Sequence, residues 1–117
     1  DMNVGLGSDI AGGTVLSIFR SMAEAIQVSK LRARLVDDRL KPITMEEAFF
    51  MGTKGGGSFF GKVGSFEEGY EIDAIVLDES RIPHPQELTV KERLERFLYL
   101  SGDDWILHKY VKGRRLF

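Results

Sequence analysis

Cysteine is missing from this sequence of 117 residues, which also has only three prolines and one tryptophan. The lack of cysteine excludes disulfide bonds and every zinc site built on thiolate ligands, and it suits the cytoplasmic location that we expect. An excess of basic residues is also lacking. The formal net charge is −2, so charge gives no reason to expect nucleic acid as a partner. No apolar run is long enough to span a bilayer, and we expect no membrane partner.

What the sequence does contain is typical of one small folded domain. Hydrophobic residues make up 43% and charged residues 29%, so a modest apolar core can form. The first residue is Asp1 rather than Met, and a predicted strand follows it almost at once. Because domains rarely open inside a core strand, we expect either a trimmed terminal segment or a longer chain upstream of Asp1.

The most informative stretch lies near the start of the chain. Residues 4–8 have the apolar and small side chains of a short strand, and Asp9 follows at its carboxyl end. Gly12 and Gly13 come next, and small residues leave room for a ligand beside the carboxylate. In barrels of alternating strands and helices, this end of a strand carries the chemistry. Asp9 is therefore a candidate site residue, although most aspartates that follow a strand merely cap the next helix.

Apolar periodicity predicts two helices in the first half of the chain. The first begins at Thr14 or Ser17 and ends near Leu35. Its apolar side chains fall on one stripe, which is made of Phe19, Met22, Ala23 and Ile26. The second begins at Thr44, which forms a capping box with Glu47, and it stops at the glycines of residues 55–57. We expect one more short turn over residues 58–61. Its predicted buried side is made of Ala48, Phe49 and Met51.

The second half of the chain changes to a strand pattern. β-Branched residues predict a strand over residues 71–78, and Thr89 with Glu92 predicts the capping box of a third helix. That helix should turn Leu94, Phe97 and Leu98 inward. Residues 105–117 alternate around Lys112-Gly113, which predicts a β-hairpin. One βα unit followed by antiparallel strands leaves both parts incomplete, and we expect the missing parts upstream.

Other motifs fail when their chemistry is checked. Residues 56–62 resemble a phosphate-binding loop, but Val63 offers no hydroxyl for magnesium and a helix precedes the glycines where a strand is needed. A dinucleotide fingerprint starting at Gly5 lacks its third glycine. His84 and His108 have no ligand-spaced partner, and we interpret each as structural or neutral, with His84 exposed in a loop between prolines.

Four stretches resemble the guanine deaminases, a family of the amidohydrolase superfamily. Residues 5–13 are similar to the last metal-binding strand of that family, and residues 43–49 with 53–56 to the helix after its barrel. Residues 64–77 resemble a strand pair common to the superfamily. Residues 97–100 with Asp103-Asp104 and the run from Tyr110 to Gly113 resemble the guanine deaminases in particular. The resemblance covers essentially all of this chain but only the C-terminal quarter of the family's length.

The resemblance implies an α/β fold. The chain would be the C-terminal piece of a metal-dependent (β/α)8 barrel, with the C-terminal strands of an accompanying β-sandwich. Residues 1–62 would form the end of the barrel, with its last strand and the following helices, and residues 63–80 would form sandwich strands. Residues 81–102 would form a loop and a helix that packs back on the barrel, and residues 103–117 a sandwich hairpin.

The resemblance also implies a function. Asp9 would be a zinc ligand and a catalytic residue that takes a proton from the attacking water, while guanine is converted to xanthine and ammonia. The remaining ligands would be histidines upstream of this sequence, together with a proton-shuttling glutamate. The complete protein would be a homodimer. Because one carboxylate cannot hold zinc in a tetrahedral site, we expect this segment alone to be inactive.

Two other interpretations remain open. The chain could come from another amidohydrolase, such as a chlorohydrolase-like enzyme or an adenosine-type deaminase. It could also be a stand-alone, non-catalytic interaction domain. A stand-alone domain would close around its own core. A piece of a barrel would instead expose apolar side chains, and those expected to be exposed are Phe19, Ile26, Phe49 and Phe59.

Overall fold

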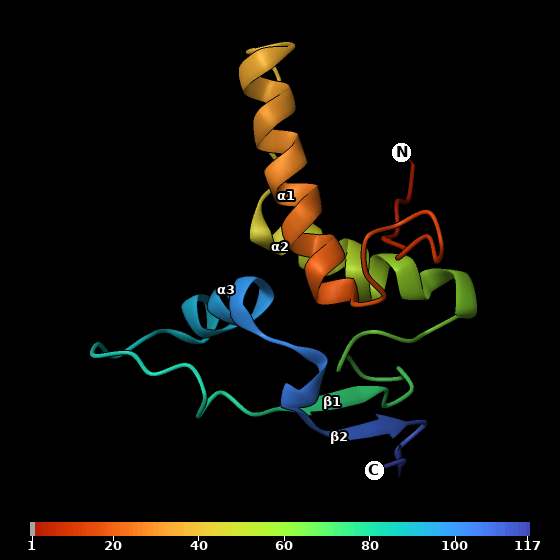
Figure 1. Ribbon diagram of the computed structural model, residues 1–117. Coiled ribbons are helices and arrows are strands. Elements are labelled where there is room, and N and C mark those ends of the chain that lie inside the picture. The colour runs from red at the N-terminus through yellow and green to blue at the C-terminus, as the bar shows by residue number, and fades with distance from the viewer. Residues whose placement is uncertain (1) are drawn as a thin grey trace.

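The computed structural model describes residues 2–117, which form a helical layer above a small sheet (Figure 1). The first helices are α1 (Ile18–Leu35) and α2 (Met45–Phe50), and α2 continues into the π-helical turn η1 (Met51–Gly55) and the 3-10 turn η2 (Ser58–Phe60). The strand β1 (Ala74–Leu77) precedes α3 (Val90–Leu100). The turn η3 (Asp103–Trp105) then leads into β2 (Ile106–Val111) and β3 (Arg114–Arg115). No helix within residues 2–117 combines the length and apolar character needed to cross a membrane.

The helix α1 confirms the predicted apolar stripe. Met22, Ala23 and Ile26 are buried, and Phe19 packs against the core at its edge. Ser17 is the N-cap residue, but its side chain makes no capping hydrogen bond. The stripe therefore holds α1 in place by burial rather than by its cap, because tertiary packing supplies most helical stability in proteins.

Both predicted capping boxes are confirmed. The backbone N–H of Glu47 donates to Thr44 Oγ1 at 3.2 Å, and the Thr44 N–H donates to Glu47 Oε2 at 2.7 Å. The same reciprocal pair joins Thr89 and Glu92, at 2.8 and 3.3 Å. Each box satisfies two backbone donors that a helix start otherwise leaves without partners.

The second helical stretch runs further than predicted. Instead of stopping at the glycines of residues 55–57, the helix continues through η1. The short turn predicted over residues 58–61 is confirmed as η2, which ends at Gly61, whose φ is +114°. A positive φ of this kind is open to glycine and costly for other residues, so the stop is set by Gly61. The glycines before it are tolerated in the helix because their neighbours pack closely on them.

The sheet is antiparallel with the order β1-β2-β3. Ala74 pairs with Tyr110 and Val76 with His108, and a bulge interrupts the register between Val76 and Leu77. The hairpin of β2 and β3 turns at Lys112 and Gly113, with φ of 51° and 73°. Two positive φ values are the signature of a tight hairpin turn, which confirms the prediction from Lys112-Gly113. The strand predicted over residues 71–78 is shorter than expected, because only Ala74–Leu77 find partners on β2.

The core lies where α1, α2 and α3 meet. Phe97 of α3 stacks edge-on against Phe19 at 5.6 Å between ring centroids, and against Trp105 at 5.8 Å. As predicted, Phe97 and Leu98 are buried and Leu94 packs at the edge of the core. The buried hydrophobic residues are Met22, Ala23, Ile26, Met45, Ala48, Ile82, Phe97 and Leu98.

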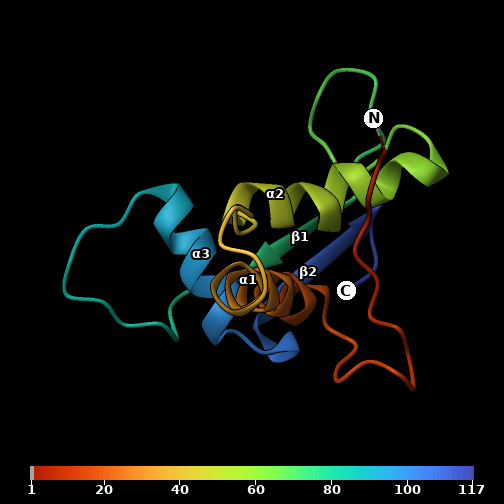
Figure 2. The same ribbon diagram turned by 90° about the horizontal axis from the view of Figure 1, so that it is seen from above.

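The fold leaves much of its apolar surface uncovered. The chain exposes 8765 Å², whereas a folded monomer of this mass exposes about 6,400 Å². Its radius of gyration is 15.4 Å, compared with about 13 Å for a compact domain of this length. Figure 2 shows one cause: the loop between β1 and α3 projects away from the rest of the chain. Phe59 is 87% exposed, as expected for a barrel piece, whereas the expected exposure of Ile26 is wrong because α2 and α3 cover it.

Candidate functional site

Asp9 stands on a tight turn that leads from the N-terminal segment toward α1. Its φ is +46° and that of Ala11 is +71°, values that are uncommon for residues other than glycine. The backbone N–H of Gly12 donates to the Asp9 carbonyl at 2.9 Å, and the N–H of Gly13 donates to the same oxygen. The backbone at Asp9 is therefore held in an unusual conformation while its side chain is exposed. Such outliers tend to gather at functional sites.

The glycines after Asp9 are required by the shape of the turn. A Cβ atom on Gly12 would lie 2.5 Å from Asp9 Oδ2, and one on Gly13 would collide with the Ser8 carbonyl oxygen. A side chain at either position would displace the carboxylate or the backbone that carries it. This supports the interpretation that small residues surround Asp9 to keep it accessible.

The strand predicted over residues 4–8 is not formed. Residues 2–9 have no strand partner within the described part of the chain, and Val4 is exposed. The segment lies instead along η1, where the Leu6 N–H donates to the Met51 carbonyl at 3.0 Å. The Asn3 side chain donates to the Gly55 carbonyl at 2.9 Å. A strand needs a neighbour to pair with, and residues 2–117 supply none here.

Asp9 has no charged or hydrogen-bonding side-chain partner among residues 2–117. The structure, over the same residues, brings no three side chains of His, Cys, Asp or Glu close enough to hold a metal ion. One carboxylate oxygen is a suitable zinc ligand, but a protein zinc site takes three or four protein ligands. The described residues therefore offer one candidate zinc ligand and not the three or four that a zinc site needs.

The other polar candidates lie on different elements from Asp9. His84 is exposed in the loop after β1, and its ring contacts the Gln86 carbonyl. His108 lies on β2, half-buried opposite Val76, and its Nδ1 has no hydrogen-bond partner among the described residues. Asp104 forms an ion pair with Arg81. The side chain of Asp103, which the resemblance also includes, lies outside the described part of the structure. The exposure of His84 agrees with the expectation from its place in a loop.

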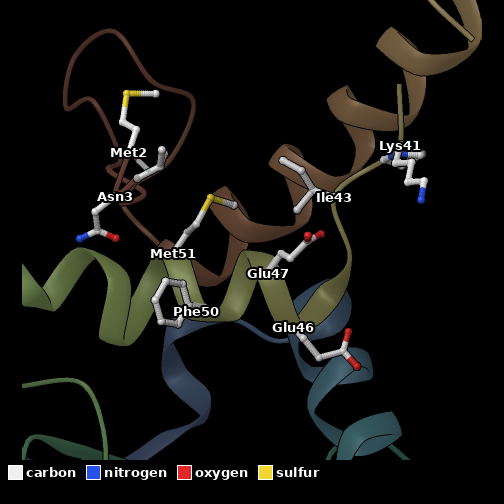
Figure 3. A pocket seen from close by; sticks show the side chains of 10 residues that line it. Met2, Asn3, Lys41, Ile43, Glu46, Glu47, Phe50 and Met51 are labelled. Carbon is white, nitrogen blue, oxygen red and sulfur yellow. The ribbon is translucent and has the colours of Figure 1, made fainter. Parts of the chain in front are cut away.

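Two grooves mark the surface, and neither is lined by Asp9. The first, of about 530 Å³, lies between the N-terminal segment and α2, with Met2, Phe50 and Glu47 among its walls (Figure 3). The second, of about 800 Å³, lies between α2 and β1 and is lined mainly by apolar side chains. Both are large enough for a small molecule, but no three side chains of His, Cys, Asp or Glu among the described residues come close enough to hold a metal ion in either.

Residues 1–116 match the family model described as the amidohydrolase family. The chain belongs to the amidohydrolase family. Human guanine deaminase is 32% identical to this amidohydrolase chain over 99% of the chain and 28% of the human protein. The chain thus spans little more than a quarter of the length of the curated relatives it matches.

Two solved amidohydrolase structures are similar to the chain. A crystal structure of guanine deaminase from C. acetobutylicum, with guanine bound in its active site, is 48% identical with a TM-score of 0.93. The alignment covers 99% of this chain and 27% of that one. The guanine deaminase of E. coli is 27% identical with a TM-score of 0.79, over 98% of this chain and 27% of that one. The chain therefore has the amidohydrolase fold, with mixed helices and strands and a small antiparallel sheet.

The sequence did not reveal which residues hold the segment before Asp9 in place. Gly5 touches the helical stretch at Gly56, and Asn3 bonds to Gly55, 52 residues further along the chain. Glycines at both places were visible in the sequence, but spacing alone does not show that two glycines meet. The signal that could have found the contact is the run of three glycines inside a helix, which is costly unless something packs against it.

Proposed function

We propose that this chain is the C-terminal segment of a zinc-dependent guanine deaminase, which converts guanine and water to xanthine and ammonia. The single observation that carries the proposal is the match to a guanine deaminase structure at 48% identity and a TM-score of 0.93 over 99% of the chain. The curated human relative and the E. coli structure named above carry the same activity in their names. The proposal includes a cytoplasmic location, supported by the lack of cysteine, and a homodimer as the complete protein.

The proposed architecture assigns each part of the chain a place in a larger fold. Residues 1–62 belong to the end of a (β/α)8 barrel, residues 63–80 and 103–117 to a β-sandwich, and residues 81–102 to a loop and helix that pack on the barrel. The unpaired segment at residues 2–9 supports this assignment, because a last barrel strand has its partners on other parts of a barrel. The surplus of exposed surface supports it as well.

In the proposed site, the Asp9 carboxylate would be one of the zinc ligands and would accept a proton from the attacking water. Zinc in a complete ligand set lowers the pKa of a water molecule toward neutrality, and this is the chemistry that the metal supplies. Because Gly12 has no side chain, the space beside the Asp9 carboxylate stays open. This open space suits a carboxylate that must be reached by both a metal ion and water. The other ligands come from outside the described residues, so this segment alone neither binds zinc tightly nor deaminates guanine.

The test uses the longer protein of which this chain is proposed to be a part. Asp9→Asn keeps the shape of the side chain and removes its charge, and we expect ammonia release from guanine to fall at least about 100-fold. Zinc content, measured in the same preparations, should also fall. Asp38→Asn is the matched control, because Asp38 is an exposed carboxylate in the link after α1.

The substrate is tested with a panel. Guanine should be turned over faster than adenosine derivatives or chlorotriazines, and a preference for either of these would place the chain in another amidohydrolase branch. Full activity in the Asp9→Asn variant would overturn the assignment of Asp9. A cooperatively folded, monomeric 117-residue chain with no upstream partner would favour a stand-alone domain instead.

A further inference from the structure

The segment before Asp9 is seated on the helical stretch by a contact between two glycines. A Cβ atom on Gly5 would lie 2.8 Å from the Gly56 Cα and 3.7 Å from the Met51 carbonyl oxygen. Real Cβ atoms do not approach a backbone atom this closely, so Gly5 lets two backbones touch that any side chain would separate. Gly56 faces the same junction, since its own Cβ would lie 3.7 Å from the Gly5 Cα.

We call the contact of residues 3–6 with residues 51–58 the seat of the N-terminal segment. Hydrogen bonds on both sides of Gly5 hold the segment in this seat. After it, the Leu6 N–H donates to the Met51 carbonyl at 3.0 Å, and the Leu6 side chain packs against the core. Before it, Asn3 Nδ2 donates to the Gly55 carbonyl at 2.9 Å and to Ser58 Oγ. Figure 3 shows Asn3 and Met51 beside each other where the N-terminal segment crosses the helix.

The N-terminal segment contacts the π-helical turn η1. A π-helical turn holds one residue more than an α-helical turn of the same height and is often found at functional sites. Here Met51 and Gly55, its first and last residues, supply the carbonyls that receive Leu6 and Asn3. The described chain thus uses the irregular turn to bind an extended segment.

Only Gly7 and Ser8 separate this seat from Asp9. A Cβ atom on Gly7 would meet nothing within 4 Å among the described residues, so Gly7 makes no close backbone contact of the kind that Gly5 makes. The position of the Asp9 carboxylate is therefore set by the seat on one side and by the turn at Gly12 and Gly13 on the other.

We propose that Gly5, through its contact with Gly56, is a positioning residue that sets where the Asp9 carboxylate stands. The part of this inference that concerns zinc rests on the proposed function, whereas the seat itself does not. Residues that orient a metal ligand typically change metal affinity by about 10- to 100-fold when they are lost.

The first experiment measures amide hydrogen exchange at Leu6 in the longer protein. Gly5→Ala forces the segment off the helix and should raise the exchange rate of the Leu6 N–H at least about tenfold. Gly7→Ala is the matched control, because it adds the same methyl group two residues away where space is open, and it should leave that rate within about threefold. Unchanged Leu6 exchange in the Gly5→Ala variant would overturn the proposal.

The second experiment measures zinc affinity and steady-state kinetics of the folded variants. Gly5→Ala should weaken zinc binding about 10- to 100-fold, while the KM for guanine at excess zinc stays close to that of the parent. A merely structural role would lower the unfolding midpoint and leave zinc affinity intact, and that result would overturn the proposal. If the parent protein does not deaminate guanine, the proposed function fails, and Leu6 exchange still decides whether the seat exists.

A gentler variant covers the case in which Gly5→Ala does not fold. Asn3→Ala removes the bonds to Gly55 and Ser58 without adding any atom. It should shift Leu6 exchange and zinc affinity in the same direction by a smaller factor. Parent values of both quantities in Asn3→Ala, in the absence of a folded Gly5→Ala variant, would count against the proposal.

Discussion

Leu98 is the side chain whose truncation should test the core most directly. It is fully buried at 0% exposure, in a cluster with Met22, Ile26 and Ala48. Leu98→Ala removes three carbon groups, which at about 0.8 kcal/mol each amounts to about 2.4 kcal/mol of lost transfer free energy. If the neighbours do not collapse, the empty space adds up to about 2 kcal/mol. We expect the free energy of unfolding to fall by about 2.5–4 kcal/mol.

The measurement is urea unfolding of each variant, followed by the fluorescence of Trp105, the only tryptophan. Its ring lies 5.8 Å from that of Phe97, next to Leu98, so the signal reports on this part of the core. Leu100→Ala is the matched control on the same helix, because Leu100 is 55% exposed and should lose less than about 0.5 kcal/mol. If Leu98→Ala does not fold, Leu98→Met should lose less than about 1.5 kcal/mol. Equal losses for Leu98→Ala and Leu100→Ala would refute the assignment of the core.

Three further predictions follow from local contacts. Thr89→Ala should lower the free energy of unfolding by about 1 kcal/mol in a urea titration, whereas Ser17→Ala, at a cap without a side-chain hydrogen bond, should change it by a few tenths. The hydrogen bond from Lys91 lowers the pKa of Glu46 below its ordinary value of 4.5, so the stabilising contribution is complete above pH 4.5 and is lost as the pH falls through the lowered pKa. Lys91→Met should move that pKa upward in an NMR titration, and an unmoved value would contradict the pairing. The 117-residue chain mixed with guanine and zinc should release no ammonia, and detectable turnover by a pure sample would refute the proposed dependence on upstream ligands.

Features decided by residues close together in sequence could be predicted. The capping boxes at Thr44 and Thr89 each depend on a partner three residues away, and the hairpin turn depends on Lys112 and Gly113 alone. The buried stripe of α1 follows from the helical period, and Ile26 shows the limit of that reasoning. The sequence predicted its apolar face but not that α2 and α3 would cover it.

Features decided by distant partners could not be predicted. Residues 4–8 have the composition of a strand, but pairing depends on neighbours that residues 2–117 do not supply. The π-helical turn at Met51–Gly55 left no periodic signal, since it differs from an α-helix by one residue in a turn. Asp9 itself was found from its place between a strand-like run and glycines. The contact of Gly5 with Gly56, which holds the segment leading to Asp9, joins positions fifty-one residues apart and needed coordinates.

Leu6 connects the buried core of the chain to the Asp9 carboxylate, which we propose as a zinc ligand. Its side chain packs against the cluster that contains Met22 and Leu98, while its backbone is bonded to Met51. Asp9, three residues later, is exposed. Burial of the Leu6 side chain in the core therefore also restrains the start of the segment that leads to Asp9. Among the described residues, no side chain binds the Asp9 carboxylate and buries it. A site arranged in this way can be held in position by one part of a fold and completed by another, which is what a metal ligand at the end of an unpaired strand segment requires.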